Sequence, residues 1–268
     1  MSKKVVIITG ASSGIGKALA FEYAKLDYRI VIAARNSENL EEVKSLLIKS
    51  NCEVISVIAD VAKEEDCKLI INAAIEKYNQ IDVLINNAGI SMRAIFEDLD
   101  LSVLKKLMDT NFWGTVYCTK YALPWLLKSK GSVVAVSSIA GFAPLPGRTG
   151  YSSSKFAIHG FLQTLRVENL KKGLHVMIAA PGFTASNIRK TALVADGSQQ
   201  GETPRAEEKL MSAEKVAFYI TQGIEKRKRS IVLTTQGKMV VLLYKLFPAF
   251  MDKVIYNSMA KEPDSPLK

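Results

Sequence analysis

The sequence is poor in the side chains that bind metals or form disulfides. Its 268 residues include three cysteines, Cys52, Cys67 and Cys118, and two histidines, His159 and His175. The cysteines lack the spacing of metal ligands, and two histidines are too few for a usual zinc site or catalytic triad. We therefore expect no metal site. A sparse and odd number of cysteines is typical of free, mostly buried thiols in a reducing cytoplasm.

The sequence also lacks a long uninterrupted apolar run. Its most apolar segment, residues 239–251, is interrupted by Lys245 and Pro248 and falls short of the ~20 apolar residues that span a bilayer. Residues 1–4 lead directly into a short apolar run, which leaves no room for a signal peptide or an N-terminal anchor. We expect a cytoplasmic protein without a transmembrane anchor.

Acidic residues are fewer than basic ones. Against 36 Lys and Arg stand 26 Asp and Glu, which gives a net charge of +10. The densest basic cluster, residues 226–229, lies where a helix is expected to end, and the helix dipole favours cations there. No nucleic-acid-binding motif accompanies the cluster, so we expect no nucleic-acid partner. A basic surface can instead attract an anionic small molecule or an anionic membrane.

Internal repeats and low-complexity linkers are absent, and 48% of the residues are hydrophobic, enough for the core of one large domain. The expected strands lie near residues 4–9, 29–34, 53–59, 82–86, 131–137, 173–180 and 230–235, and the expected helices near 14–26, 37–50, 64–79, 101–129, 151–171 and 212–228. This alternation predicts a single-domain α/β Rossmann fold, a doubly wound parallel sheet of about seven strands with helices on both faces. Such sheets bind ligands beyond the carboxyl ends of their strands.

A glycine-rich turn follows the first expected strand. Residues 9–16 read Thr-Gly-Ala-Ser-Ser-Gly-Ile-Gly and lie between an apolar run and a helical segment. Glycines permit a tight turn, and the helix N-terminus offers free N–H groups and a positive dipole end to a pyrophosphate. The pyrophosphate site is expected to include Gly10, Ser12, Ser13, Gly14, Ile15 and Gly16.

The end of the second expected strand indicates which dinucleotide binds. An NAD site normally has an acidic residue there that holds the ribose 2′-hydroxyl, whereas residues 33–36 read Ala-Ala-Arg-Asn. No carboxylate repels a 2′-phosphate, and Arg35, followed by Asn36, offers a planar fork of donors for one. Ser12 and Ser13 can add hydroxyl donors. The sequence therefore favours NADP(H), the alternative being an arginine that merely ends a surface strand.

Tyr151 and Lys155 are four residues apart, with Ser138 and Asn111 upstream. Four residues make about one helical turn, so the phenol and the ammonium project from one face of a helix. The ammonium favours phenolate and is expected to lower a tyrosine pKa that starts near ~10. A tyrosine tuned in this way can exchange a proton with an alcohol or a carbonyl oxygen.

In order and spacing, the motifs of this chain resemble those of the short-chain dehydrogenase/reductase family up to about residue 235. They are Thr9-Gly10-x-x-x-Gly14-x-Gly16, Asp60-Val61, Asn86-Asn87-Ala88-Gly89, Asn111, Ser138, Tyr151-x-x-x-Lys155 and Pro181-Gly182-x-Thr184. The resemblance implies that residues 1–235 form an NADP-binding Rossmann domain. Residues 236–268 would be an apolar C-terminal extension and tail of the same domain.

The resemblance also implies cofactor contacts beyond the glycine turn. Asp60 and Val61 would hold the adenine edge, and residues 87–89, Asn-Ala-Gly, would form the floor of the cofactor site. Residues 181–184 would complete this site, with Pro181 and Gly182 in its wall and Thr184 at the nicotinamide carboxamide.

A mechanism follows from the same resemblance. A substrate carbonyl would accept hydrogen bonds from Ser138 and Tyr151, the nicotinamide would supply hydride, and Tyr151 would supply the proton. Lys155 would bind the nicotinamide ribose and lower the pKa of Tyr151. Asn111 would hold a water that reconnects Lys155 to solvent. The family spacing selects Ser138 over Ser137.

Residues 91–93, Ser-Met-Arg, and the Phe247-Pro248 pair resemble the 11β-hydroxysteroid-dehydrogenase-like branch, which handles apolar carbonyls. The resemblance therefore implies interconversion of an apolar ketone or aldehyde and its alcohol. The enzymatic alternative is a 3-oxoacyl-thioester reductase, disfavoured because the glycine-rich ending of those enzymes is absent. The non-enzymatic alternative is an NADP-binding sensor or scaffold, disfavoured because the tyrosine, lysine, serine and asparagine are all retained.

Further expectations concern the surroundings of the site. Residues 183–211 would form a long connection that acts as a lid. Residues 239–260 would pack over the cleft or a partner subunit, the favoured alternative, or lie in a membrane interface as amphipathic helices split at Pro248. The polar tail, residues 261–268, would be mobile. The family resemblance also implies a homodimer or homotetramer, built on the long helices near 101–129 and 151–171.

Overall fold

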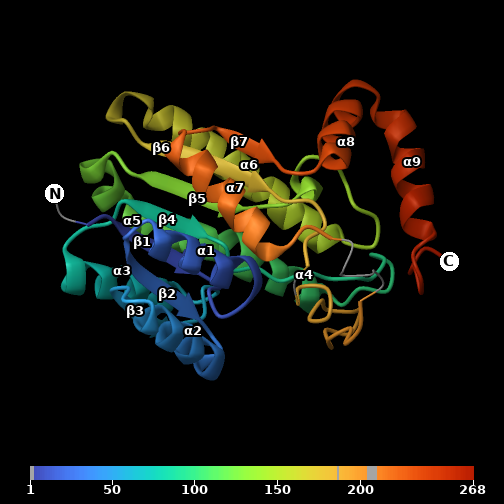
Figure 1. The fold of residues 1–268 in the computed structure, drawn as a ribbon. Helices are drawn as coiled ribbons and strands as arrows, with labels where there is room; N and C mark the ends of the chain where they lie inside the picture. The colour runs from blue at the N-terminus through green and yellow to red at the C-terminus, as the bar shows by residue number, and fades with distance from the viewer. Residues whose placement is uncertain (1–2, 186, 204–209) are drawn as a thin grey trace.

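A seven-stranded parallel sheet forms the centre of the protein, in the order β3-β2-β1-β4-β5-β6-β7 (Figure 1). The computed structural model describes residues 3–185, 187–203 and 210–268. The strands are β1 (Val5–Thr9), β2 (Arg29–Ala34), β3 (Val54–Ile58), β4 (Val83–Asn86), β5 (Ser132–Val136), β6 (His175–Ala180) and β7 (Ser230–Val232). The strand order reverses between β1 and β4, and open α/β sheets bind ligands at such a point. The predicted fold class is confirmed.

Helices cover both faces of this sheet. One face packs against α1 (Gly14–Lys25), α2 (Ser37–Lys49) and α7 (Ala213–Glu225), and the other against α3 (Glu64–Tyr78), α5 (Gly114–Ser129) and α6 (Thr149–Glu168). Successive side chains of a strand point to opposite faces. In β1, Val6 and Ile8 enter the first core while Val5 and Ile7 enter the second. Both faces are buried, which is why the strands read as continuous apolar runs.

Two expected elements differ from the structure. The helix predicted over 101–129 is divided into α4 (Leu101–Leu107), a π-helical segment η1 (Met108–Trp113) and α5. The last strand is shorter than predicted because Thr234 already caps the next helix, its Oγ1 accepting a hydrogen bond from the Gly237 amide at 3.0 Å.

The C-terminal residues form two helices, α8 (Thr235–Leu246) and α9 (Pro248–Ala260), beyond the carboxyl ends of the strands (Figure 1). Their inner residues make a small core of their own. It contains Ala143, Leu145, Val240, Leu243, Tyr244, Met251, Ile255, Met259 and Leu267. Among the described residues, no helix is long and apolar enough to cross a membrane.

The tail after α9 is not mobile as predicted but folds back onto the domain. Glu262 and Ser265 are buried, and the Pro266 ring packs beside Gly147. Of the segment expected to act as a lid, residues 186 and 204–209 lie outside the described residues. Its described part includes β-bridges from Thr184 to Met211 and from Leu193 to Met92.

Candidate active site

A cavity of about 930 Å³ lies at the carboxyl ends of the strands. All of the predicted site residues line it except Gly16 and Asn111, which pack behind its wall. The lining residues predicted from the sequence are Gly10, Ser12, Ser13, Gly14, Ile15, Arg35, Asn36, Asp60, Val61, Asn87, Ala88, Gly89, Ser138, Tyr151, Lys155, Pro181, Gly182 and Thr184.

The turn between β1 and α1 is tied to the end of β4 by hydrogen bonds. Thr9 Oγ1 accepts from the amides of Asn87 and Ala88, both at 3.1 Å. Asn87 Nδ2 donates in return to the carbonyls of Thr9 and Gly10, at 2.9 and 3.1 Å. These bonds hold two adjacent loops together at the point where the strand order reverses.

Two glycines of this turn have no room for a side chain. A Cβ at Gly10 would lie 2.8 Å from the Cα of Ala88, and Gly10 has φ +65°, which also disfavours other residues. A Cβ at Gly16 would lie 2.2 Å from the Gly10 carbonyl oxygen. Ser13 precedes α1 without a side-chain capping bond. The helix N-terminus therefore fits an anionic group such as a pyrophosphate.

One end of the cavity lies beyond β2 and β3. Arg35 Nη1 lies 3.9 Å from Asp60 Oδ2, and the Arg35 side chain is 55% exposed. Asp60 Oδ1 accepts from the Ala62 amide at 3.1 Å. Asn36 Oδ1 caps α2 by accepting from the Asn39 amide at 2.8 Å, so this side chain has a structural task. The guanidinium of Arg35, the residue that directly follows β2, thus places a positive charge at the cavity.

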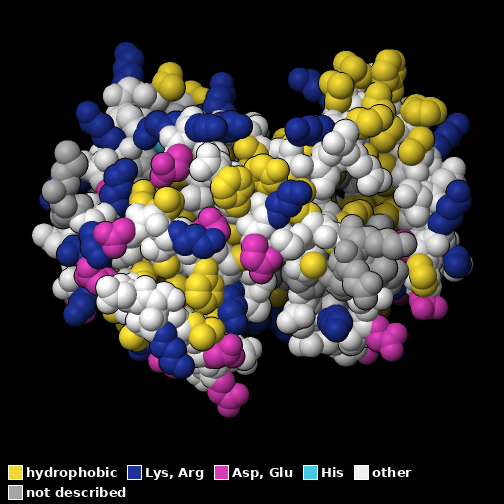
Figure 2. Space-filling view, viewed as in Figure 1, with side chains coloured by type: hydrophobic (Ala, Val, Ile, Leu, Met, Phe, Trp, Pro, Cys, Tyr) yellow, Lys and Arg dark blue, Asp and Glu magenta, His cyan; other side chains and the backbone are white. Residues whose placement is uncertain are grey.

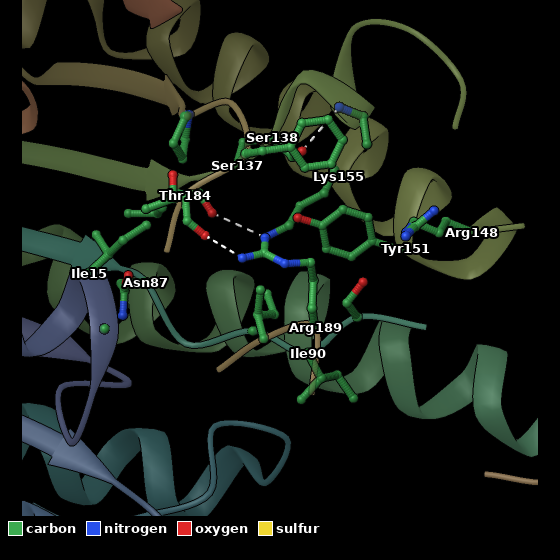
Figure 3. Close-up of a pocket in the computed structure, with 18 of the residues that line it drawn as sticks. Ile15, Asn87, Ile90, Ser137, Ser138, Arg148, Tyr151, Lys155, Thr184 and Arg189 are labelled. Atoms are coloured by element: carbon green, nitrogen blue, oxygen red, sulfur yellow. Dashed lines mark hydrogen bonds between the residues drawn. The ribbon is translucent and has the colours of Figure 1, made fainter. Parts of the chain in front are cut away.

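Tyr151, in the first turn of α6, lines the same cavity as Ser138, which follows β5 (Figure 3). Burial raises the pKa of Tyr151 above its ordinary value. The Ser138 hydrogen bond and the charges of Arg148 and Arg189 oppose this effect only in part. The expectation of a lowered pKa is therefore wrong in direction, because the sequence does not reveal how deeply the phenol is buried.

Lys155 lies one turn further along α6 and lines the same cavity. Its Nζ donates to the Val136 carbonyl at 3.1 Å and stands 5.6 Å from the centroid of the Tyr151 ring. Burial lowers the pKa of Lys155 to about 8. A pKa of about 8 leaves the amine mostly protonated at neutral pH.

Asn111 lies in the π-helical segment η1, behind the cavity wall. Its Oδ1 accepts from the Ile90 amide at 2.8 Å, and its Nδ2 donates to the Ile90 carbonyl at 3.0 Å and to Ser154 Oγ at 2.9 Å. Ser154 Oγ donates to the Tyr151 carbonyl at 2.7 Å. Asn111 thereby connects the loop after β4 to the helix of Tyr151. π-helical segments are frequent at functional sites.

The loop after β6 lines another side of the cavity. A Cβ at Gly182 would lie 2.7 Å from Thr234, so this loop packs tightly on the start of α8. Thr184 Oγ1 donates to the Gly182 carbonyl at 3.1 Å. The Thr184 carbonyl accepts from Arg189 Nη2 at 2.8 Å. Arg189 also donates through Nε to Thr203 Oγ1 at 3.2 Å.

Sequence reasoning missed several residues at this site. Arg148 and Arg189 line the cavity with Tyr151 (Figure 3). The apolar residues that α9 contributes, including Ile255 and Met259, lie in the segment that was predicted to pack over the cleft or a partner subunit. The two arginines stand in no motif that would have revealed them. Ser137, passed over in favour of Ser138, bonds instead to His159, with 2.7 Å between Oγ and Nε2. That contact gives His159 a structural role.

Comparison with known proteins agrees with this geometry. Residues 4–196 match the family model described as short chain dehydrogenase. The chain is 42% identical over 187 residues to 11-beta-hydroxysteroid dehydrogenase 1A of Arabidopsis thaliana, an alignment that covers 69% of this chain and 53% of the relative. The chain thus spans about half the length of several curated relatives that it matches.

Solved structures share the fold. A short chain dehydrogenase/reductase from Burkholderia phymatum in complex with NAD has a TM-score of 0.84 and 22% identity, covering 93% of this chain and 95% of its own. An alcohol dehydrogenase from the archaeon Thermococcus sibiricus complexed with 5-hydroxy-NADP has a TM-score of 0.76 and 23% identity, covering 87% and 96%. The chain belongs to the short-chain dehydrogenase family, whose members are oxidoreductases that act on CH–OH groups with a nicotinamide cofactor.

Proposed function

We propose that this protein is an NADP(H)-dependent oxidoreductase that interconverts an apolar ketone or aldehyde and its alcohol. The observation that carries the proposal is the placement of Ser138 and Tyr151, with Lys155 one helical turn away, in one cavity that continues from a glycine turn to an apolar wall. The pair provides two hydroxyl groups for one oxygen atom of a substrate. The glycine turn and the wall fit a dinucleotide and an apolar group.

When bound, the nicotinamide would supply or accept the hydride. Residues 10–16 of the glycine turn would hold the pyrophosphate of the dinucleotide against the N-terminus of α1. Thr184 and its neighbours 181–182 would hold the nicotinamide end, and Asp60 with Val61 the adenine end. The tight contacts of Gly10 and Gly16 support this assignment, because no side chain stands between the backbone and a phosphate there.

Tyr151 would act as the acid in carbonyl reduction. Its raised pKa keeps the phenol protonated near neutral pH, so it can donate to the alkoxide that develops as hydride arrives. Ser138 would donate a second hydrogen bond to the same oxygen. Lys155 stays mostly cationic and would bind the nicotinamide ribose, and Asn111 would support proton return through a water beside Lys155. Reduction then consumes one hydride and one proton for each carbonyl.

NADP(H) is favoured over NAD(H) by the charges at the end of β2. Arg35 is a cation at the cavity, and the residue that ends the strand, Ala34, has no carboxylate to repel a 2′-phosphate. Asp60 lies 3.9 Å from Arg35, which orients the guanidinium and partly offsets its charge.

An apolar substrate is supported by the far end of the cavity. Side chains from two regions line it, Leu145 from the loop after β5, and Val240, Met251, Ile255 and Met259 from α8 and α9. Such a wall favours a hydrocarbon group beside the reacting carbonyl. A relative named for hydroxysteroid oxidation is consistent with this class of substrate.

We also infer peripheral contact between the outer surface of α8–α9 and an anionic membrane. Large apolar side chains gather there with lysines nearby (Figure 2); the exposed apolar residues are Met239, Leu242, Leu246, Phe247, Phe250, Val254 and Tyr256. Lys238, Lys245 and Lys253 are exposed on the same helices. Self-association through this surface would bring like charges together, whereas anionic lipids would complement them. Sedimentation with phosphatidylserine vesicles, but not with neutral ones, is the expected result.

A homodimer or homotetramer would use a different surface. Trp113, Phe156, Val167 and Leu170 are exposed on or beside the long helices α5 and α6, as expected for helices that pack against a second copy. Sedimentation equilibrium would give the number of chains, and a monomer would contradict this assignment.

The test of the proposed activity is NADPH oxidation, followed by absorbance, across a carbonyl panel from short ketones and 3-oxoacyl thioesters to steroids and retinal. Turnover restricted to apolar ketones or aldehydes is expected. Turnover restricted to 3-oxoacyl thioesters would favour the alternative enzyme. NADPH binding without turnover of any carbonyl would favour a sensor or scaffold.

A further inference from the structure

The C-terminal tail carries a buried carboxylate that is shared by two buried arginines. Glu262 Oε2 lies 3.7 Å from Arg93 Nη2 and 3.8 Å from Arg148 Nη2. The side chain of Glu262 is 7% exposed, and those of both arginines are 8% exposed. Buried charges of this kind are costly to desolvate, and removing one partner leaves the others uncompensated. The three charges therefore hold each other in place.

Each arginine belongs to a loop beside the candidate active site. Arg93 follows the cofactor loop 87–89 and Arg148 directly precedes α6, three residues before Tyr151. The two loops are joined by the Ala94 amide, which donates to the Gly147 carbonyl at 2.9 Å. Glu262 therefore pairs with one arginine on each of the two loops that meet beside the cavity.

Arg93 also contacts the backbone of the tail. Its Nη2 donates to the Pro263 carbonyl at 2.6 Å. Its Nε is buried without a hydrogen-bond partner among the described residues. Arg93 is therefore held in this position largely by the tail, across 170 residues of sequence.

The tail in turn anchors the apolar wall. Met259, near the end of α9 and three residues before Glu262, lines the cavity. Ile255, one helical turn before Met259, lines it as well. Both pack into the small core that includes Ala143 and Leu145. The opposite side of α9 is exposed. Among the helices and strands, α9 packs mainly against α8, so the ion pairs of Glu262 at its end add a direct tie between the wall and the domain.

We propose that Glu262 is a positioning residue for substrate: by binding Arg93 and Arg148 it fixes α9 over the substrate end of the cavity and fixes the entry to the helix of Tyr151. This inference rests on the proposed function for its kinetic consequence. Its structural consequence, an α9 that opens when the cluster is broken, is independent of any activity.

The test compares Glu262→Gln with Asp264→Asn. The first removes the buried charge and keeps the shape of the side chain. The second makes the same kind of change two residues further on, at an exposed position with a left-handed backbone (φ +48°) that asparagine tolerates. For Glu262→Gln we expect the KM of the carbonyl substrate to rise about tenfold with kcat and NADPH affinity little changed, since a displaced wall weakens substrate positioning. Asp264→Asn should match the wild type.

Hydrogen exchange supplies the readout that needs no substrate. In Glu262→Gln the amides of α9 should exchange at least about tenfold faster, while those of β1 and β5 stay protected. Unchanged exchange in α9, or faster exchange with an unchanged KM, would overturn the proposal. If the wild type reduces no carbonyl, the proposed function fails while the exchange experiment still decides whether the cluster holds α9.

One further measurement checks folding, and two further variants test the coupling. NADPH binding reports whether Glu262→Gln is folded. Glu262→Asp, which keeps the charge but shortens the side chain, should give a smaller KM increase. Arg148→Gln combined with Glu262→Gln should raise the KM by less than the product of the single effects, because the partners act as a unit. Multiplicative effects would contradict a shared cluster.

Discussion

The two ends of the cavity are built in different ways. The end proposed for the cofactor, here the cofactor end, consists of turns that directly follow strands, held by hydrogen bonds of the Thr9 and Asn87 side chains to neighbouring backbone groups. The end proposed for substrate, here the substrate end, is closed by α9 and the tail, which are tied to the domain by contacts between residues as far apart as Arg93 and Pro263. The first end lies in a buried sheet, and the second rests on a small separate core. The first end is therefore held within the main fold, whereas the position of the second depends on contacts made by the C-terminal residues.

The largest expected effect comes from Tyr151→Phe, which leaves both ends in place but removes the acid between them. The phenylalanine ring keeps the packing of Tyr151 against the buried cluster that includes Met92 and Val103. Turnover should fall about 10²- to 10⁴-fold, the usual contribution of a general acid, while NADPH affinity should stay close to that of the wild type. Steady-state kinetics and NADPH fluorescence titration would check this.

Tyr23→Phe is the matched control for that experiment. Tyr23 is buried in the core, and its hydroxyl has no partner among the described residues. Removing this hydroxyl should leave turnover unchanged. A Tyr151→Phe enzyme with wild-type turnover would show that the acid lies elsewhere.

Gly16→Ala should prevent the dinucleotide from binding, so a substrate in the cavity would lack a hydride donor. The new Cβ would lie 2.2 Å from the Gly10 carbonyl oxygen, so the turn must shift. Overpacking of this kind costs about 1–3 kcal/mol of stability, and we expect NADPH binding to be lost. Calorimetry with and without NADPH would measure both effects.

Gly160→Ala provides the opposite case within α6. A Cβ at Gly160 meets no atom within 4 Å. Because alanine favours a helix over glycine, this variant should gain about 0.5–1 kcal/mol of stability with unchanged NADPH binding. Equal losses in both glycine variants would contradict the tight-turn interpretation.

A smaller effect is expected from Arg35→Gln, which tests the charge of the cofactor end alone. Loss of a charge-assisted hydrogen bond to a phosphate costs about 1.5–3 kcal/mol, so the KM for NADPH should rise about ten- to hundredfold. The KM for NADH, which lacks the 2′-phosphate, should change little. An equal rise for both cofactors would indicate that Arg35 supports the fold rather than selecting NADP(H).

The contrast between the two ends also explains what the sequence could predict. The glycine turn, the strands and the Tyr151–Lys155 spacing depend on neighbours in the chain, and the structure places them at one cavity as expected. The raised pKa of Tyr151 depends on burial, which the spacing of Tyr151 and Lys155 does not encode. Arg189 and the bonded tail were missed for a similar reason, because their roles come from tertiary contacts. The division of the helix over 101–129 was missed because helical periodicity does not mark a π-helical turn.

An effect on stability alone is expected at His159, which joins α6 to the loop after β5 through Ser137. Burial, with a contribution from the charge of Lys155, lowers the pKa of His159 to about 4. Between a pH of about 6.5 and about 4 the unfolded chain binds a proton that the folded chain does not, so the free energy of unfolding falls as the pH falls through this window. The loss attributable to His159 is on the order of 1–3 kcal/mol.

His159→Gln should therefore lower stability at pH 7 but reduce the further loss on acidification, because glutamine does not titrate. Urea unfolding at pH 7 and pH 5 would measure the two differences. His175, whose pKa burial also lowers, keeps its own contribution in the variant, so the slope should decrease without vanishing. An unchanged slope would show that the pKa of His159 is the same in the folded and the unfolded chain, so that its burial does not disfavour the charged ring.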